Sequence, residues 1–459
     1  MIHAFTATLA SRRAPLARAA LALALASFSG ACRESAELPV GAGIGAHPTL
    51  PPPTHALVAT AEIAPARGWP PGGAPKVAGD LAVTALASGL QHPRWLYVLP
   101  NGDVLVAETN GPPRPDNEKG VKGWVTKRMY KKAGSAGPSA ERITLLRDKD
   151  GDGRAETRTT FARNLTSPFG MALIGTNFYV ADTDAILRFP YVANADALAG
   201  GGVKLTDLPA GPLNHHWTKN ILASADGTKL YATVGSNSNA AENGLDKETD
   251  RASIWEIDVA TGNHRVFATG LRNPCGLAWE PNTGTTGALW TVVNERDELG
   301  SDVPPDYLTS VRAGGFYGWP YSYFGTHVDE RVKPQRPDLV ARAIVPDYAL
   351  GAHTASLGLV RADGNALPDR FAHGMFVGQH GSWNRRPRSG YKVIFVPFWR
   401  GKPTGEPLDV VTGFVDAAGE ANGRPVGVAL DKTGALLVAD DVGNTVWRVS
   451  TAPARAARQ

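Results

Sequence analysis

A sequence unit that recurs about six times constrains the fold of this chain more than any other feature. In its fullest form the unit passes through a proline into an apolar strand, then through a Gly-containing turn into a second strand. Short alternating strands joined by such turns indicate β-hairpins. The copies begin near Gly89, Asn164, His216, Arg272, Ser356 and Arg424. One few-stranded sheet buries too little surface alone, so the repeats predict an all-β, six-bladed β-propeller whose sheets share one core.

The two ends of a closed ring have to be joined, so we expect the N- and C-terminal strands to share one blade. The propeller domain is expected over residues 81–452. A pair of β-sandwiches is the alternative fold, but it would not explain the recurring unit. The polar, cationic stretch at 112–138 lies between the first two units and predicts a surface excursion beside the functional site.

The first 32 residues have the pattern of an export signal. A charged stretch with Arg12 and Arg13 precedes an apolar run at 19–28 that is too short to span a bilayer. Ser-Gly-Ala-Cys at 29–32 resembles a bacterial lipobox, in which Cys32 would carry a lipid that anchors the protein to the outer membrane. The alternative is an ordinary cleaved signal with an incidental cysteine. Both interpretations predict a periplasmic protein, and the Ala/Gly/Pro-rich residues 33–80 predict a flexible tether.

Composition and absent motifs argue against several function classes. The net charge is +4, and the basic residues are scattered without a basic helix, which does not favour nucleic-acid binding. No Gly-x-Gly-x-x-Gly follows a strand, so a nicotinamide-binding fold is not supported. No Gly-x-Ser-x-Gly elbow indicates a serine hydrolase.

Two side chains in the repeated units have the chemistry of a catalytic site. His216 lies in Asn-His-His-Trp-Thr-Lys-Asn at 214–220, and Arg272 lies in Leu-Arg-Asn-Pro at 271–274. Histidine exchanges a proton near neutral pH, and arginine can stabilise an oxyanion. Both lie where a β unit presents a loop, which favours a functional role. The alternatives are a buried histidine that holds its blade and an arginine paired with a carboxylate of the next blade.

Several longer motifs together resemble one known family. They are Gly-Gly-Phe-Tyr-Gly-Trp-Pro at 314–320, Asn-Glu-Arg-Asp at 294–297, Pro-Asp-Tyr-Leu at 305–308 and Gly-Gln-His-Gly-Ser-Trp-Asn-Arg at 378–385. With the His216 and Arg272 segments, they resemble the glucose/sorbosone dehydrogenase family, in its sorbosone-dehydrogenase-like branch. The resemblance spans roughly residues 81–450. It implies a soluble six-bladed quinoprotein that uses pyrroloquinoline quinone (PQQ) and calcium.

The resemblance also implies roles for individual residues. His216 would be the base that takes the hydroxyl proton, and Arg272 would stabilise the reduced oxygen of the quinone. The residues implied to bind PQQ are Arg272, Asn273, Arg385 and Arg424. The residues implied to hold calcium are Glu295, Asp297 and Asp302. The expected reaction is hydride transfer from a sugar or a sugar-derived aldehyde or alcohol to PQQ. Because the chain has no Cys-x-x-Cys-His haem motif, the electrons would leave to a separate acceptor.

Two other functions remain open from the sequence. One is a non-catalytic propeller that binds carbohydrate or protein, and the other is a lactonase-like hydrolase, which would need a central metal held by carboxylates and amides of several blades. A separate loop, Asp-Lys-Asp-Gly-Asp-Gly-Arg-Ala-Glu at 148–156, begins like an EF-hand but has Thr159 at its twelfth position. It predicts either a structural calcium site or an acidic hairpin turn.

Overall fold

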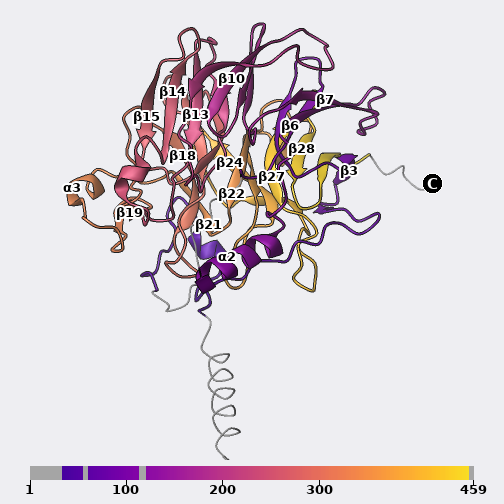
Figure 1. Cartoon of the computed structure of the whole chain (residues 1–459). Helices are drawn as coiled ribbons and strands as arrows, with labels where there is room; N and C mark the ends of the chain where they lie inside the picture. Colours follow the sequence, from indigo (N-terminus) through magenta and orange to yellow (C-terminus); the bar gives the residue numbers. More distant parts are fainter. Residues whose placement is uncertain (1–33, 55–59, 113–119, 454–459) are drawn as a thin grey trace, which may run out of the picture.

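Six antiparallel sheets arranged as blades in a ring make up most of the protein (Figure 1), which confirms the six-bladed β-propeller. The computed structural model describes residues 34–54, 60–112 and 120–453. Blades 1 and 2 comprise β4 (Pro93–Val98), β5 (Val104–Glu108), β6 (Arg142–Arg147) and β7 (Thr157–Arg163), then β8 (Met171–Ile174), β9 (Asn177–Ala181), β10 (Ala185–Pro190) and β11 (Val203–Asp207). Blades 3 and 4 comprise β12 (Ile221–Ala223), β13 (Lys229–Val234), β14 (Ser253–Asp258) and β15 (His264–Thr269), then β16 (Pro274–Glu280), β17 (Ala288–Val293), β18 (Pro305–Val311) and β21 (Tyr348–Ala352). Blades 5 and 6 comprise β22 (Ser356–Arg361), β23 (Gly374–Gln379), β24 (Lys392–Trp399) and β26 (Leu408–Thr412), then β27 (Pro425–Leu430), β28 (Leu436–Asp440), β29 (Thr445–Thr451) and β3 (Leu81–Ser88).

The remaining elements are short and lie between or beside the blades. The additional strands are β1 (Ile44–Gly45), β2 (Lys76–Val77), β19 (Ser322–Tyr323), β20 (His327–Val328) and β25 (Lys402–Pro403). The helices are η1 (Val40–Gly43), α2 (Gly120–Ala133), η2 (Leu245–Glu248), α3 (Pro337–Val340) and η3 (Asp369–Phe371). Within the described ranges, none of the helices combines the length and the apolar character needed to cross a bilayer.

Each repeated unit supplies the innermost strand of one blade. These strands are β4, β8, β12, β16, β22 and β27, and they contact one another in chain order around a closed ring. Glycine within the unit permits this close approach. A Cβ atom at Gly276 would lie 2.5 Å from the Cβ of Leu359, and one at Gly358 would lie 2.1 Å from the carbonyl oxygen of Val426. These glycines of the repeated unit therefore allow the inner strands of neighbouring blades to pack closely around the axis of the ring.

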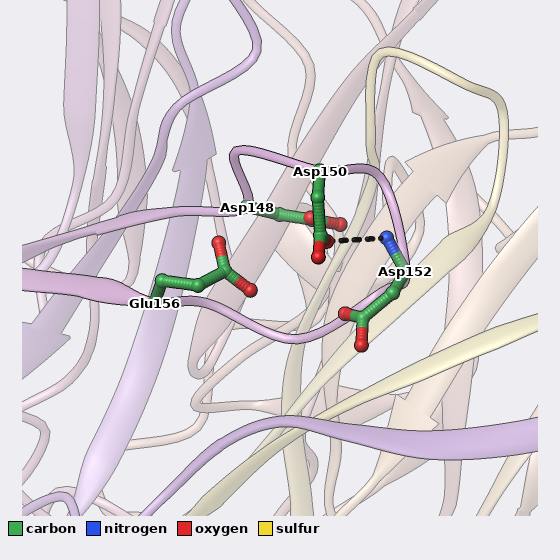
Figure 2. A group of neighbouring side chains, drawn as sticks. All are labelled: Asp148, Asp150, Asp152 and Glu156. Atoms are coloured by element: carbon green, nitrogen blue, oxygen red, sulfur yellow. Dashed lines mark hydrogen bonds between the residues drawn. The ribbon is translucent and has the colours of Figure 1, made fainter.

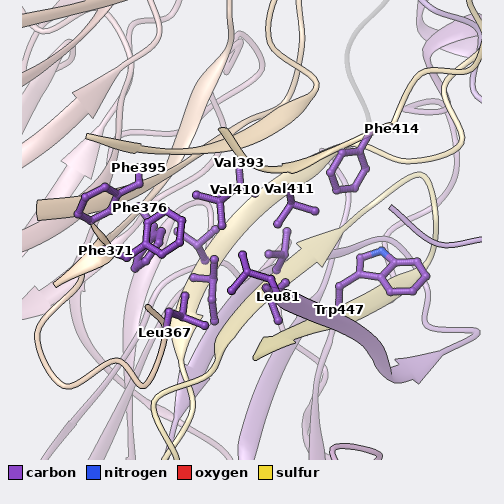
Figure 3. Close-up of a cluster of buried hydrophobic side chains, with 14 of the residues drawn as sticks. Leu81, Leu367, Phe371, Phe376, Val393, Phe395, Val410, Val411, Phe414 and Trp447 are labelled. Carbon is purple, nitrogen blue, oxygen red and sulfur yellow. The ribbon is translucent and has the colours of Figure 1, made fainter. Parts of the chain in front are cut away.

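The ring closes in blade 6, where the two ends of the propeller sequence meet. Strand β3 pairs antiparallel with β29, from Leu81 opposite Thr451 to Ser88 opposite Thr445, which confirms the shared blade. A buried apolar cluster fills the space beside this closure (Figure 3). Phe376 and Phe395 are completely buried there, with ring centroids 5.1 Å apart. Burial of one such side chain stabilises a fold by about 1.5–3 kcal/mol, so the closure is held by packing as well as by the strand ladder.

The segment expected to be a flexible tether instead packs against the propeller over its described residues. Strand β1 extends blade 4 beside β21, and β2 extends blade 5 beside β26. Trp69 packs edge-on against Trp447 and Phe414, with centroids 5.5 and 5.7 Å away, and its Nε1 donates to Asp440 at 2.7 Å. The Ala/Gly/Pro-rich composition did not predict this packing, because only a few large side chains, such as Trp69, anchor the segment. Cys32 and the predicted signal sequence lie outside the described residues.

The excursion expected at 112–138 contains helix α2, which joins β5 to β6 of blade 1. Figure 1 shows α2 beyond the edge of the blades, at the lower end of the view. The amide of Ala66 donates to the carbonyl of Lys132 at 2.8 Å, and Asn110 Nδ2 donates to the carbonyl of Gly137 at 2.7 Å. The end of the helix and the loop after it are thus fastened to the rest of the fold.

Candidate functional site

A cleft of about 1670 Å³ is lined by loops that lead into or connect the inner strands. His216 lies in the loop before β12, Arg272 in the loop before β16 and His353 in the loop before β22, whereas Arg94 belongs to β4 and His380 follows β23. Side chains that are far apart in the sequence therefore converge because each unit places its loop at the same end of the ring. The cleft contains His216 and Arg272, as the sequence predicts for a site.

The hydrogen bonds around His216 define its tautomer. Its Nδ1 lies 2.8 Å from the carbonyl oxygen of Ser236 and 3.0 Å from the Ser236 hydroxyl oxygen. That hydroxyl donates its single proton to the carbonyl of Ser238 at 2.7 Å, so both Ser236 oxygens act as acceptors toward His216. The proton of the neutral ring must therefore be on Nδ1, which leaves Nε2 as the basic atom. This is the tautomer that a general base requires.

Arg272 is buried, and most of its hydrogen bonds go to neutral groups, with Asp297 as its nearest carboxylate. Its guanidinium donates to the carbonyl of Glu295 at 2.6 Å and to Asn239 Oδ1 at 2.9 Å, and both partners are neutral groups. The carboxylate of Asp297 is 3.7 Å from Nη2. Burial lowers the pKa of Arg272 from its usual value, although the nearby acids oppose that shift. A fixed cation in this position can stabilise an anion in the cleft.

Asn273 lies behind the histidine and does not line the cleft. A Cβ atom at Gly235 would be 2.4 Å from the Cβ of His216 and 2.5 Å from Asn273 Oδ1. Gly235 is therefore the residue that lets these two side chains approach one backbone position. In the described part of the chain, Asn273 Oδ1 has no hydrogen-bond partner although it is buried.

The three carboxylates expected to hold calcium do not gather in one place. Glu295 and Asp297 line the cleft, where Glu295 binds Arg296 at 2.9 Å and Asp297 lies 3.4 Å from His353. Burial acts to raise the pKa of Asp297, but its bond to His353 and the charge of Arg272 outweigh that effect and lower it. Asp302 instead turns toward the N-terminal segment and accepts from the amide of Glu37 at 2.6 Å. Among the described atoms, Glu295 Oε1 is the buried carboxylate oxygen of this set that lacks a partner.

The two arginines expected in a cofactor cradle have different surroundings. The guanidinium of Arg385 donates to the carbonyls of Pro387 and Leu38, at 2.7 and 3.0 Å, and thus fastens part of the N-terminal segment. Arg424 is completely buried over the ring of Tyr391, and its Nη2 donates to the carbonyl of Ala64 at 2.7 Å. Its Nε and Nη1 have no partner within the described residues. The structure therefore separates Arg385 from the cleft and leaves Arg424 with unused donors.

A buried cluster in which Arg94, His92 and His380 surround Asp441 was not found from the sequence. Arg94 Nη1 donates to Asp441 Oδ2 at 2.7 Å, and His380 Nε2 lies 2.9 Å from the same oxygen. Burial acts to raise the pKa of Asp441, but the facing His380, His92 and Arg94 lower it far below its usual range. Arg94 and His380 line the cleft. Arg94 lies in the first repeat unit, and His380 lies in the Gly-Gln-His-Gly motif. Only their shared contact with Asp441 in the structure identifies both as residues of the site.

A second polar network holds the loop that carries His216. Lys219 is completely buried, and its Nζ lies 3.4 and 3.3 Å from the carbonyl oxygens of His216 and Trp217. The Trp217 carbonyl also accepts from Thr183 Oγ1 at 2.8 Å, and Thr183 accepts from Asn214 Nδ2 at 2.9 Å. Burial lowers the pKa of Lys219 to about 7. This network fixes the backbone from which the His216 ring projects.

The acidic loop between β6 and β7 brings four carboxylates together away from the cleft (Figure 2). One oxygen from each of Asp148, Asp150, Asp152 and Glu156 lies within 4.8 Å of the others. The two oxygens of Asp148 accept from the amides of Gly151 and Gly153, both at 2.8 Å, as in a tight acidic turn. The structural calcium site and the hairpin turn thus remain alternatives, and neither belongs to the cleft.

Fold and site together define a class, the six-bladed propellers with a cleft at one end of the ring that arginine and histidine side chains line. The chain belongs to the TrAA12-like family, whose family model matches residues 138–306 and 336–452. A pyrroloquinoline quinone-dependent pyranose dehydrogenase of Coprinopsis cinerea is 26% identical over 223 residues, which cover 40% of this chain and 30% of the length of that protein. An uncharacterized protein of Borreliella burgdorferi is 26% identical over 303 residues, which cover 63% of this chain and 77% of that protein.

Solved structures show the same architecture. The holo form of the pyranose dehydrogenase PQQ domain of Coprinopsis cinerea has a TM-score of 0.64 and 20% identity, covering 82% of this chain and 97% of that domain. The calcium structure of a Trichoderma reesei carbohydrate-active enzyme of family AA12 has a TM-score of 0.66 and 17% identity, covering 83% and 97%. The family resemblance inferred from the sequence motifs is thus confirmed, and these structural likenesses support the propeller fold.

Proposed function

We propose that this protein is a PQQ-dependent dehydrogenase that oxidises a sugar or a sugar-derived aldehyde or alcohol. The observation that carries the proposal is His216, whose Nδ1 proton is committed to Ser236 while its Nε2 is the basic atom in a cleft shared with Arg272. Oxidation of a hydroxyl-bearing carbon requires a base within reach of that hydroxyl. Membership of the TrAA12-like family supports the same reaction class.

The residues around the cleft fit an anionic cofactor such as PQQ, which is a tricarboxylate. Arg94 Nε is a buried guanidinium nitrogen without a hydrogen-bond partner in the described residues, and so are Arg385 Nε and both Nε and Nη1 of Arg424. Such donors bind carboxylates strongly, because burial without a partner is costly for them. Arg94 and Arg272 line the cleft whereas Arg424 does not, so we assign the carboxylates of the cofactor to Arg94 and Arg272. When bound there, the quinone would supply the acceptor for hydride from the substrate.

Calcium has a smaller set of candidate ligands here than the sequence indicates. Glu295 Oε1 is available near the cleft, and backbone carbonyls are common calcium ligands. Asp297 is engaged by His353, and Asp302 faces the N-terminal segment. We therefore propose that Glu295 is the carboxylate that contacts a cation, which would act as a Lewis acid beside the cofactor.

The side chains of the cleft have separate tasks in the proposed reaction. His216 Nε2 takes the proton of the substrate hydroxyl, and the carbonyl of Ser236 stabilises the imidazolium through Nδ1. Arg272 supplies positive charge to the oxygen that becomes anionic. Lys219 holds the His216 loop through two carbonyls. The electrons then leave to a separate acceptor in the periplasm, to which we propose the protein is exported, with Cys32 as the site of a lipid anchor.

Reconstitution tests this function. Purified protein is titrated with PQQ and calcium chloride, and we expect a quinone absorbance band and sugar-dependent reduction of an artificial dye. Absence of PQQ binding at micromolar concentration would contradict the proposal. In that case, binding of a sugar without turnover would favour a binding module, and hydrolysis of a lactone without PQQ would favour a hydrolase.

A further inference from the structure

The wall formed by α2 belongs to a part of the chain that the family model does not match. The match begins at residue 138, whereas α2 contributes Lys127, Met129 and Tyr130 to the lining of the cleft. The end of the helix is fastened to the N-terminal segment, because the amide of Ala66 donates to the carbonyl of Lys132. The chain thus adds a rigid wall to the site that the family model does not describe.

The wall formed by α2 extends from blade 1 across blade 6 to a loop of blade 5. Helix α2 lies in the β5–β6 connection of blade 1, and Trp383 lies in the β23–β24 connection of blade 5. The rings of Tyr130 and Trp383 are 5.6 Å apart at an interplanar angle of 61°, so the two connections meet above blade 6. Because blades contact one another in chain order, blade 6 is opposite blade 3, whose entry loop carries His216. The aromatic pair and the base therefore lie on opposite sides of one cleft.

The volume and the lining of the cleft indicate which kind of ligand would reach from His216 to the aromatic pair. Its volume of about 1670 Å³ exceeds the ~300–1,000 Å³ that a pocket for one small ligand usually has. Flat aromatic side chains provide a large apolar contact area at low entropic cost, and a pyranose ring offers a face of C–H groups to them. Both rings are half-buried and line the cleft, so each combines a fixed position with exposed surface.

We propose that Tyr130 and Trp383 form a subsite for a second or third sugar ring, so that the preferred substrate is an oligosaccharide. The reducing end would lie at His216, and the chain would extend across the ring to the aromatic pair. This substrate class rests on the proposed sugar oxidation, but the subsite itself is a binding property. It is therefore measurable without cofactor or turnover.

Calorimetric titration of the protein before any cofactor is added tests the subsite. The probes are glucose, cellotriose and maltotriose, and the variants are Tyr130→Leu and Trp383→Leu, which keep apolar volume but lose the flat ring. We expect at least one trisaccharide to bind more tightly than glucose, and each variant to weaken that trisaccharide by roughly 3- to 10-fold with little effect on glucose. Trp399→Leu is the matched control, because Trp399 is 69% exposed and does not line the cleft.

The outcomes separate this inference from the proposed function. Equal affinities for glucose and both trisaccharides, or no measurable binding of either trisaccharide, would overturn the subsite. Loss of affinity in Trp399→Leu equal to that in Trp383→Leu would also overturn it. Trisaccharide binding that depends on the aromatic pair in a protein that does not take up PQQ would support the subsite and refute the dehydrogenase. If one aromatic variant does not fold, the other provides the same comparison.

Discussion

Replacement of Lys219 by methionine tests how the buried amine contributes to stability and to the His216 loop. Methionine has a similar length but no charge, so Lys219→Met removes the ammonium and its two carbonyl contacts. Burial lowers the pKa of Lys219 from about 10.5 to about 7. Between these values the Lys219 side chain binds more protons in the unfolded chain than in the folded one, so its contribution to the free energy of unfolding rises with pH.

The size of this effect follows from the shift. One pKa unit corresponds to about 1.4 kcal/mol, so the wild type should gain about 2 kcal/mol relative to Lys219→Met between pH 7 and pH 9. Below pH 7 the amine is charged in both states, and the difference between the two proteins should be constant. We also expect Lys219→Met to lower turnover more than it changes substrate affinity, because the loop that positions the base loses two contacts.

Urea unfolding followed by tryptophan fluorescence at pH 6, 7, 8 and 9 measures the effect. Lys229→Met is the control, because Lys229 is paired with Asp258 at 2.6 Å and that bond raises its pKa. Lys229 stays charged in folded and unfolded chains over this range, so its variant should follow the pH dependence of the wild type. Parallel curves for wild type and Lys219→Met between pH 7 and 9 would refute the assignment of a buried amine that loses its proton near neutrality.

Four further substitutions test other parts of the proposed structure and function. His216→Gln should leave folding and PQQ affinity near wild type while turnover falls by about 10²–10⁴, whereas a lower melting temperature with an unchanged rate would indicate a structural histidine. Arg272→Ala should weaken both PQQ binding, measured by absorbance titration, and turnover; unchanged PQQ affinity would contradict its place in the cradle. Trp69→Ala should lower the free energy of unfolding by about 1–3 kcal/mol because the side chain is half-buried, and an unchanged urea midpoint would mean that Trp69 adds no stability. Cys32→Ser should move the protein from the membrane fraction to the periplasmic fraction, and a wild type that is already soluble would exclude the anchor.

The sequence by itself determined the blades and the positions of two site residues. Strand alternation and glycine turns act over a few residues, so the repeats predicted the inner strands and the closure through β3 and β29. His216 and Arg272 follow from the same regularity, because each occupies the loop that leads into an inner strand.

Only the tertiary structure decided which charged groups face the cleft. Arg385 and Arg94 are equally cationic in the sequence, but Arg385 reaches the carbonyl of Leu38, 347 positions away, whereas Arg94 pairs with Asp441 beneath the cleft. The same holds for α2, whose Tyr130 acquires a role through contact with Trp383 of another blade. The direction of a long side chain depends on partners that are distant in the chain, and a local pattern contains no information about them.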